Sequence, residues 1–218
     1  MSNCGVLFDM DGTLIDSEPY WHNSETAVVE HYGGTWSLEQ GKKLTGRTLY
    51  ESGRIILEES GIEADINEVL HKILDYQIVQ LKKRVPWFDG VTELLGDLAV
   101  HNVKTALVSS SYRCIVDVVC ADAPKGTLDL SIAGDEVTRG KPDPEPYLVA
   151  AKSLGLSPHN CVVVEDSPSG VEAGLRAGMK VVGICGDFDF SGQPVTRQIK
   201  NLGNMCAEDF LHIVQVHD

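Results

Sequence analysis

Two aspartates separated by one residue, Asp9 and Asp11, are the side chains of this sequence best placed to do chemistry. They follow an apolar run at residues 6–8 and precede Gly12. A short β-branched and aromatic run followed by glycine is typical of a buried strand that ends in a tight turn. In an open α/β sheet, ligands bind at the carboxyl ends of the strands, so an acidic pair there needs a metal ion or a shared proton to relieve its repulsion.

Other polar residues favour a functional site over an ordinary turn, although aspartate and glycine are common in turns for conformational reasons. One further apolar run ends at Ser109 and another at Glu165 and Asp166. Lys141 precedes a predicted helix start, where its charge and the helix dipole both favour an anion. Because parallel strands point the same way, we expect these groups to meet along one edge of a sheet.

The segment after the first strand is predicted to be helical throughout. Ser17 is a suitable N-cap for its first helix, and no strand-like run interrupts the helical patterns before residue 87. We therefore expect an all-helical cap domain over residues 17–86, inserted into a core domain made of residues 1–16 and 87–218. The helices predicted within the cap domain lie at residues 17–32, 49–59 and 66–83.

Past residue 90, helical and strand-like patterns alternate along the chain. This alternation predicts an α/β fold with a mostly parallel, doubly wound sheet. One helix is expected to begin at Pro144 with Asp143 as its N-cap. The predicted strands lie at residues 103–108, 130–133, 161–164 and 181–184, and the predicted helices at residues 91–99, 112–120, 144–154 and 169–177.

The composition indicates enough apolar material for a full core. Of the 218 residues, 43% are hydrophobic, and the formal net charge is -14 with a pI near 4.8. An acidic surface repels polyanions, so we expect neither nucleic acid nor a membrane as a partner. The chain shows no signal peptide or membrane-spanning stretch, which predicts a cytoplasmic location. Six cysteines without CxxC spacing favour reduced thiols over disulfides or a zinc site.

The motifs and their order resemble those of the haloacid dehalogenase superfamily, in the subgroup of phosphatases and sugar phosphate mutases with a helical cap after the first strand. The family's DxDx(T/V) motif matches residues 9–13, and its serine motif matches Ser109. Its lysine motif matches Lys141, and its acidic motif matches Glu165 and Asp166. The resemblance spans essentially the whole chain and implies a Rossmann-like core.

The resemblance assigns Asp9 as the nucleophile, which attacks phosphorus and forms an aspartyl-phosphate. It assigns Asp11 as the general acid that protonates the leaving oxygen and then as the base that activates water. A Mg²⁺ ion is expected on Asp9, the Asp11 backbone carbonyl and Asp166. Glu165 is assigned to the same metal site, with contact through a water molecule as one alternative.

Phosphate binding is assigned to Ser109 and Lys141, which also count as catalytic, and to Ser110 beside them. Arg47 lies in a cap loop that resembles the family's substrate loop, so it is expected to meet substrate oxygens. The alternative for Arg47 is a solvated arginine on the surface. Trp21, early in the cap, is expected to serve core packing, and Thr13 to support the turn after the first strand.

The function expected is a Mg²⁺-dependent phosphatase that acts on a small phosphate ester, such as a sugar phosphate, as a monomer. A sugar phosphate mutase resembling β-phosphoglucomutase is the alternative. Mutases of this kind tend to carry valine where Thr13 stands, which favours the phosphatase. A response-regulator receiver would also use acids, a hydroxyl, a lysine and Mg²⁺, but it needs neither the helical insert nor the DxD spacing.

Overall fold

The computed structural model describes residues 3–186 and 188–215 and is built around one parallel sheet. Its strand order, β3-β2-β1-β4-β5-β6, runs outward in both directions from the central β1. This arrangement confirms the expected doubly wound sheet. The strands are β1 (Gly5–Phe8), β2 (Lys104–Val108), β3 (Leu130–Ile132), β4 (Cys161–Glu165), β5 (Lys180–Ile184) and β6 (Arg197–Ile199).

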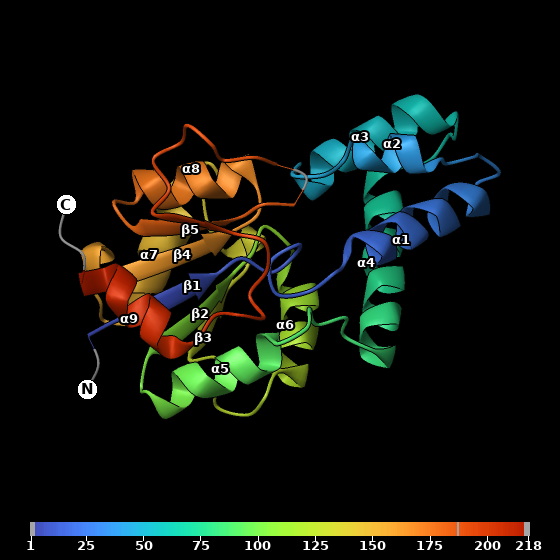
Figure 1. Ribbon diagram of the computed structural model, residues 1–218. Helices are drawn as coiled ribbons and strands as arrows, with labels where there is room; N and C mark the ends of the chain where they lie inside the picture. Colours follow the sequence, from blue (N-terminus) through green and yellow to red (C-terminus); the bar gives the residue numbers. More distant parts are fainter. Residues whose placement is uncertain (1–2, 187, 216–218) are drawn as a thin grey trace.

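Each face of the sheet has its own apolar core, because side chains alternate along a strand. Val6 and Phe8 of β1 belong to one cluster, and Leu7 belongs to the other. Figure 1 shows helices on both sides of the sheet. The first cluster is covered by α5 (Val91–Val100), α6 (Arg113–Asp122) and α9 (Ala207–Gln215), and the second by α7 (Glu145–Ser153) and α8 (Pro168–Arg176).

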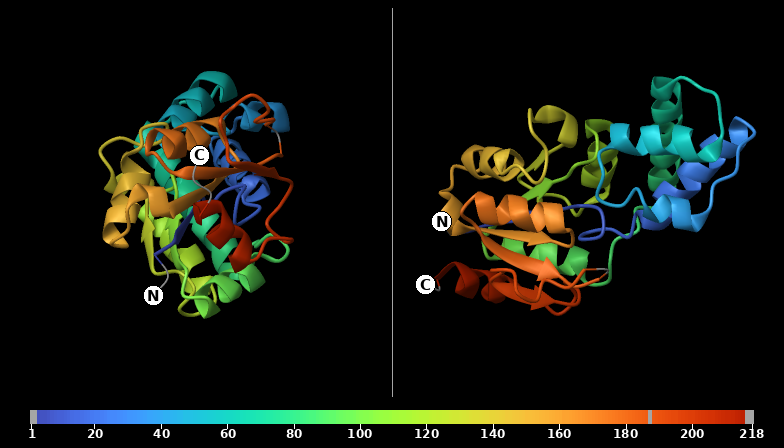
Figure 2. Two further views of the ribbon diagram at one scale, coloured as in Figure 1. Left: turned by 60° about the vertical axis from the view of Figure 1, so that its left-hand side comes forward. Right: turned by 90° about the horizontal axis from the view of Figure 1, so that it is seen from above.

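A helical unit is inserted between β1 and α5, as the sequence predicts. It has a small apolar cluster of its own, to which Val28, Trp36, Ile56 and Ile73 contribute. Figures 1 and 2 show the unit beyond the carboxyl ends of the strands, where it leaves both faces of the sheet to other helices. The boundaries at 16/17 and 86/87 stay a prediction. Its helices are α1 (Glu18–His31), α2 (Leu38–Lys42), α3 (Leu49–Ser60) and α4 (Ile66–Lys83).

The two chain segments that connect the helical unit to the sheet lie side by side. The Asp16 backbone N–H donates to the Pro86 carbonyl at 2.8 Å, and the Phe88 N–H donates to the Leu14 carbonyl at 3.1 Å. Leu81, near the end of α4, packs into the apolar cluster of the sheet. The helical unit is therefore joined to the sheet by paired backbone and by an apolar contact.

Two α-helices and one strand of the described residues carried no sequence prediction of their own: α2, α9 and β6. Strand β6 is short and largely exposed, so it lacks the apolar run that marks a buried strand. Helix α7 begins at Glu145 with Pro144 as N-cap, one residue later than expected, while the Asp143 carboxylate accepts a hydrogen bond from the Glu145 N–H at 2.9 Å. Within the described residues, the helices are too short or too polar to cross a membrane. The cytoplasmic location and the monomeric state stay predictions.

Candidate functional site

The polar groups meet at the carboxyl edge of the sheet because three neighbouring strands end together. Phe8, the last residue of β1, is in register with β2 and β4 one residue before each of those strands ends. Asp9 therefore leaves the sheet beside the strand ends that continue into Ser109 and Asp166. Lys141 reaches the same edge from the loop between β3 and α7.

Lys141 is fixed by three acceptors. Its Nζ lies 2.6 Å from Asp9 Oδ1, 2.6 Å from Glu165 Oε1 and 2.9 Å from the Val108 carbonyl oxygen. These bonds use all three protons of an ammonium group, and the side chain is 4% exposed. Burial lowers the pKa of Lys141, but the charges of Asp9 and Glu165 outweigh burial and raise it, so this lysine stays charged.

Three acids gather around that lysine. Asp9, Glu165 and Asp166 each offer a carboxylate oxygen, and these oxygens lie within 4.8 Å of one another. Burial raises the pKa of Asp9 well above its usual range, and Lys141 opposes this shift only in part. Burial, followed by the charge of Glu165, raises the pKa of Asp166 to about 7. The cluster thus holds more negative charge than one lysine neutralises, which suits a hard divalent cation with oxygen ligands.

Glu165 is the most enclosed acid of the site, with no exposed surface. Its Oε1 accepts from Lys141 and from the Tyr147 hydroxyl at 2.8 Å, and its Oε2 accepts from the backbone N–H and the hydroxyl of Ser167 at 3.2 and 2.9 Å. Gly170 leaves room for this carboxylate, because a Cβ there would overlap its oxygen atoms.

Asp11 has different partners. Its Oδ1 accepts a short hydrogen bond from the Ser17 hydroxyl and another from Trp21 Nε1 at 3.1 Å. Its Oδ2 accepts from the Ser111 hydroxyl at 2.8 Å, with Ser109 Oγ at 3.5 Å. All four donors are neutral, and two of them come from the start of the helical unit. Asp11 is therefore held in place without a cation.

The structure brings most of the predicted site residues together, although it does not test their roles. Asp9, Asp11, Ser109, Lys141, Glu165 and Asp166 all lie at this edge. Thr13 is buried, with its hydroxyl 3.5 Å from Asp166 Oδ1, in keeping with a supporting role. Asp11 lies outside the close acidic cluster, so only its backbone carbonyl is retained as a candidate ligand.

Two predicted substrate contacts stay predictions. Ser110 is exposed next to Ser109. Arg47 is also exposed, and its Nε donates to the Lys43 carbonyl at 2.7 Å rather than to a group of the site. Its loop joins α2 to α3 in the helical unit. The expected role of Arg47 in substrate binding thus has no support from its contacts.

Sequence reasoning missed several donors of the site. Ser17 is the residue before α1, but its hydroxyl makes no capping bond and is used by Asp11 instead. Trp21 does pack against apolar residues, and it also donates to Asp11. Ser111 belongs to the run of three serines after β2, and this run could have indicated a hydroxyl donor at the site from the sequence. Tyr147 lies in an apolar helix, where its sequence context predicts packing alone.

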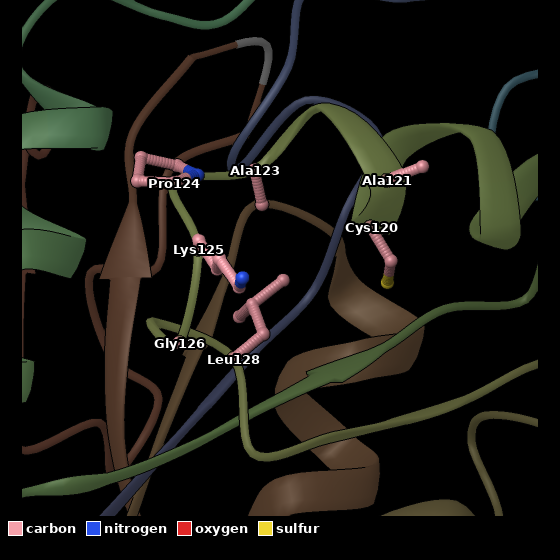
Figure 3. A pocket seen from close by; sticks show the side chains of 7 residues that line it. All are labelled: Cys120, Ala121, Ala123, Pro124, Lys125, Gly126 and Leu128. Atoms are coloured by element: carbon pink, nitrogen blue, oxygen red, sulfur yellow. The ribbon is translucent and has the colours of Figure 1, made fainter.

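A separate hollow lies near the end of α6 (Figure 3). Residues 123–128 precede β3, so they lie toward the amino edge of the parallel sheet, opposite the edge that carries Asp9. The lining offers one cation and one thiol and includes no carboxylate. It is formed by Cys120, Ala121, Ala123, Pro124, Lys125, Gly126 and Leu128.

The chain is similar to a known protein family and to proteins of known name. A family model described as haloacid dehalogenase-like hydrolase matches residues 6–184. A phosphorylated carbohydrates phosphatase of Thermotoga maritima is 31% identical over 177 residues, which cover 80% of this chain and 82% of that protein. A β-phosphoglucomutase of Bacillus subtilis is 32% identical over 195 residues, which cover 82% of each.

Two further similarities differ in extent. A bifunctional riboflavin kinase/FMN phosphatase of Arabidopsis thaliana is 32% identical over 186 residues, or 84% of this chain, and this chain spans about half (48%) of that protein. A crystal structure of β-phosphoglucomutase from Clostridium difficile matches 96% of each chain with a TM-score of 0.81 at 22% identity. The second similarity shows the shared fold.

Proposed function

The chain belongs to the haloacid dehalogenase-like hydrolases, and from this premise we propose that it is a Mg²⁺-dependent phosphatase that forms an aspartyl-phosphate. The observation that carries the proposal is the contrast between two aspartates of one turn. Asp9 is buried against Lys141 and the acidic cluster, whereas Asp11 is held by neutral donors. Two carboxylates with such different surroundings suit different roles in one reaction.

The donor set fits a magnesium ion. Carboxylate oxygens are the ligands that Mg²⁺ prefers, and the raised pKa of Asp166 reflects negative charge that a cation would relieve. Asp9 and Asp166, with the Asp11 backbone carbonyl, would hold the ion. When bound, it would neutralise charge on the phosphoryl oxygens.

In the first step, an Asp9 carboxylate oxygen attacks phosphorus, and the bond between phosphorus and the alcohol oxygen breaks. A carboxylate that approaches a phosphate dianion meets like charge, and the Lys141 ammonium beside Asp9 offsets part of that repulsion. The Ser109 hydroxyl, at the same edge, donates to a phosphoryl oxygen. Asp11, protonated by the water consumed in the preceding turnover, gives that proton to the departing alcohol oxygen, so the product leaves as a neutral alcohol.

In the second step, Asp11 takes a proton from water as that water attacks the phosphorus of the aspartyl-phosphate. The bond from Asp9 to phosphorus breaks, inorganic phosphate leaves, and Asp9 returns as a carboxylate. The donors from Ser17, Trp21 and Ser111 would hold the Asp11 carboxylate in one place through both steps. One residue can thus act as acid and then as base.

The substrate class we propose is a small phosphorylated carbohydrate. The relative from Thermotoga maritima is a phosphatase of phosphorylated carbohydrates by its name. The proposal is tested by measuring released phosphate from a panel of phosphate monoesters with Mg²⁺ and with EDTA. Hydrolysis of a sugar or sugar-alcohol phosphate that EDTA abolishes is expected. A panel without any Mg²⁺-dependent release would contradict the proposal.

A sugar phosphate mutase is the second candidate, because the Bacillus subtilis mutase is as similar to this chain as the Thermotoga phosphatase is. A mutase must hold a second phosphate away from Asp9, yet Arg47, the expected cation, bonds the Lys43 carbonyl. We therefore expect free phosphate as the product. Phosphorus NMR of the products decides, since an isomeric sugar phosphate with little free phosphate would establish the mutase.

A further inference from the structure

Tyr147 is a buried polar residue to which the proposed reaction gives no role. It lies in α7 with no exposed surface, among the apolar residues that cover one face of the sheet. Phenylalanine would fill the same apolar space without a hydroxyl to satisfy. The hydroxyl donates to Glu165 Oε1 at 2.8 Å, and Lys141 Nζ lies 5.1 Å from the centroid of the tyrosine ring.

The hydrogen bond from Tyr147 completes the set of donors around the Glu165 carboxylate. An ionised carboxylate accepts about four hydrogen bonds, and Glu165 accepts four: one from Lys141, one from Tyr147 and two from Ser167. Glu165 also lies close enough to Asp9 and Asp166 to bind the same cation. To do so, its carboxylate would have to give up one of these donors.

Lys141 depends on that arrangement. Its ammonium group donates hydrogen bonds to Asp9, Glu165 and the Val108 carbonyl. The position of Glu165 therefore helps to set where the ammonium lies relative to Asp9. If Glu165 turned toward the cation, Lys141 would lose one of two charged partners. The metal would then gain a ligand, and the Lys141 ammonium would be held less firmly beside Asp9.

We propose that Tyr147 is a positioning residue whose hydroxyl keeps Glu165 on Lys141 and leaves the cation to Asp9 and Asp166. The hydroxyl acts on the reaction only through these two residues. This inference rests on the proposed function for its effect on turnover, whereas its effect on metal binding can be measured without any substrate.

The test is Tyr147→Phe, which removes one oxygen and keeps the ring beside Lys141. Mn²⁺ binding is measured by electron paramagnetic resonance in the absence of substrate, and kcat is measured on the best phosphate ester with saturating Mg²⁺. We expect Tyr147→Phe to bind Mn²⁺ about 5- to 10-fold more tightly, because Glu165 becomes a ligand, and to lower kcat about 10-fold or more. A loss of structural support alone would weaken metal binding and turnover together.

Two further variants make the result specific. Adding Glu165→Gln to Tyr147→Phe should remove the gain in Mn²⁺ affinity, since the amide is a poor ligand. Tyr32→Phe is the matched control, because the Tyr32 hydroxyl also donates to a glutamate, Glu68 at 3.4 Å, but within the helical unit. It should leave both measurements unchanged.

The outcomes separate this inference from the proposed function. Unchanged or weaker Mn²⁺ binding in Tyr147→Phe would overturn the positioning role, whatever the activity. A gain that survives Glu165→Gln would overturn it too. If the wild-type protein hydrolyses no phosphate ester while the Mn²⁺ affinities change as expected, the proposed function fails and the role of Tyr147 in placing Glu165 stands.

Discussion

Asp9 and Asp11 are separated by one residue in the chain and face different parts of the molecule. The partners of Asp9 are charged groups of the sheet domain, namely Lys141 and the neighbouring acids. Asp11 is bound by neutral donors, of which Ser17 and Trp21 come from the start of the helical unit. The sheet domain alone can thus build the surroundings of Asp9, whereas those of Asp11 include donors from the inserted helices.

The turn that follows Asp11 lies against the acidic cluster. Gly12 has a φ of +82°, and a Cβ at this position would overlap the Asp166 carboxylate. Glycine is the residue that accepts this backbone and this close approach. The turn after Asp11 can therefore pass close to the Asp166 carboxylate on its way to the helical unit.

The largest expected effect comes from Asp9→Asn. An amide keeps the shape of the side chain but is a poor nucleophile, so kcat should fall by roughly 10⁵-fold or more, the scale seen when a covalent nucleophile is lost. Phosphate release and circular dichroism are measured on the same preparation. Near wild-type hydrolysis by a folded variant would contradict the proposed role of Asp9 as the nucleophile.

Asp11→Asn should be less severe, with a loss of about 10²- to 10⁴-fold, and it should depend on the leaving group. Nitrophenolate leaves without a proton, so with p-nitrophenyl phosphate the first step continues and the second stalls. We expect a burst of one nitrophenolate per enzyme and accumulation of aspartyl-phosphate. Asp9→Asn should show no burst, and an equal burst in both variants would refute the division of roles.

Trp21→Phe tests the contribution of the helical unit to the Asp11 side. Removing the indole N–H takes one donor from a carboxylate, so kcat should fall about 10- to 100-fold, while Mn²⁺ affinity on the Asp9 side stays the same. The control is Trp36→Phe, which removes an indole bond to Glu25 at 3.0 Å inside the helical unit. Equal losses from both variants would mean that the indole of Trp21 has no specific link to Asp11.

The smallest expected effect is on stability and depends on pH. Because the pKa of Asp166 is raised to about 7 in the folded protein, the metal-free fold holds this proton more tightly than the unfolded chain. That contribution is fully present below about pH 4 and is lost as the pH rises to about 7. Bound Mg²⁺ takes the place of the lost proton. The rise in the Tm of the protein on addition of Mg²⁺ should therefore be about 2–4 °C at pH 8 and smaller at pH 6.

Asp166→Asn is the control for this measurement, since an amide has no proton to lose in this range. The variant should show little Mg²⁺ stabilisation at either pH by differential scanning fluorimetry. A Mg²⁺ gain that is larger at pH 6 than at pH 8 would contradict the sign of the linkage and would place the cation away from Asp166.

Local patterns in the sequence were enough to predict the sheet edge and the helical insertion. Buried parallel strands are short apolar runs, so the residues that follow them, such as Asp9, Ser109 and Asp166, could be placed at one edge from the pattern of residue types alone. Helical periodicity likewise marked the inserted unit. Strand β6 escaped because its exposed residues do not form an apolar run.

Only the tertiary structure decided which donors serve each carboxylate. Ser111 lies 100 residues from Asp11 in the chain, and Tyr147 lies 18 residues from Glu165. Trp21 and Tyr147 both stand among apolar residues, a context that predicts packing and says nothing about where an indole N–H or a hydroxyl points. Hydrogen-bond direction depends on how whole helices dock, and that docking is absent from the local sequence.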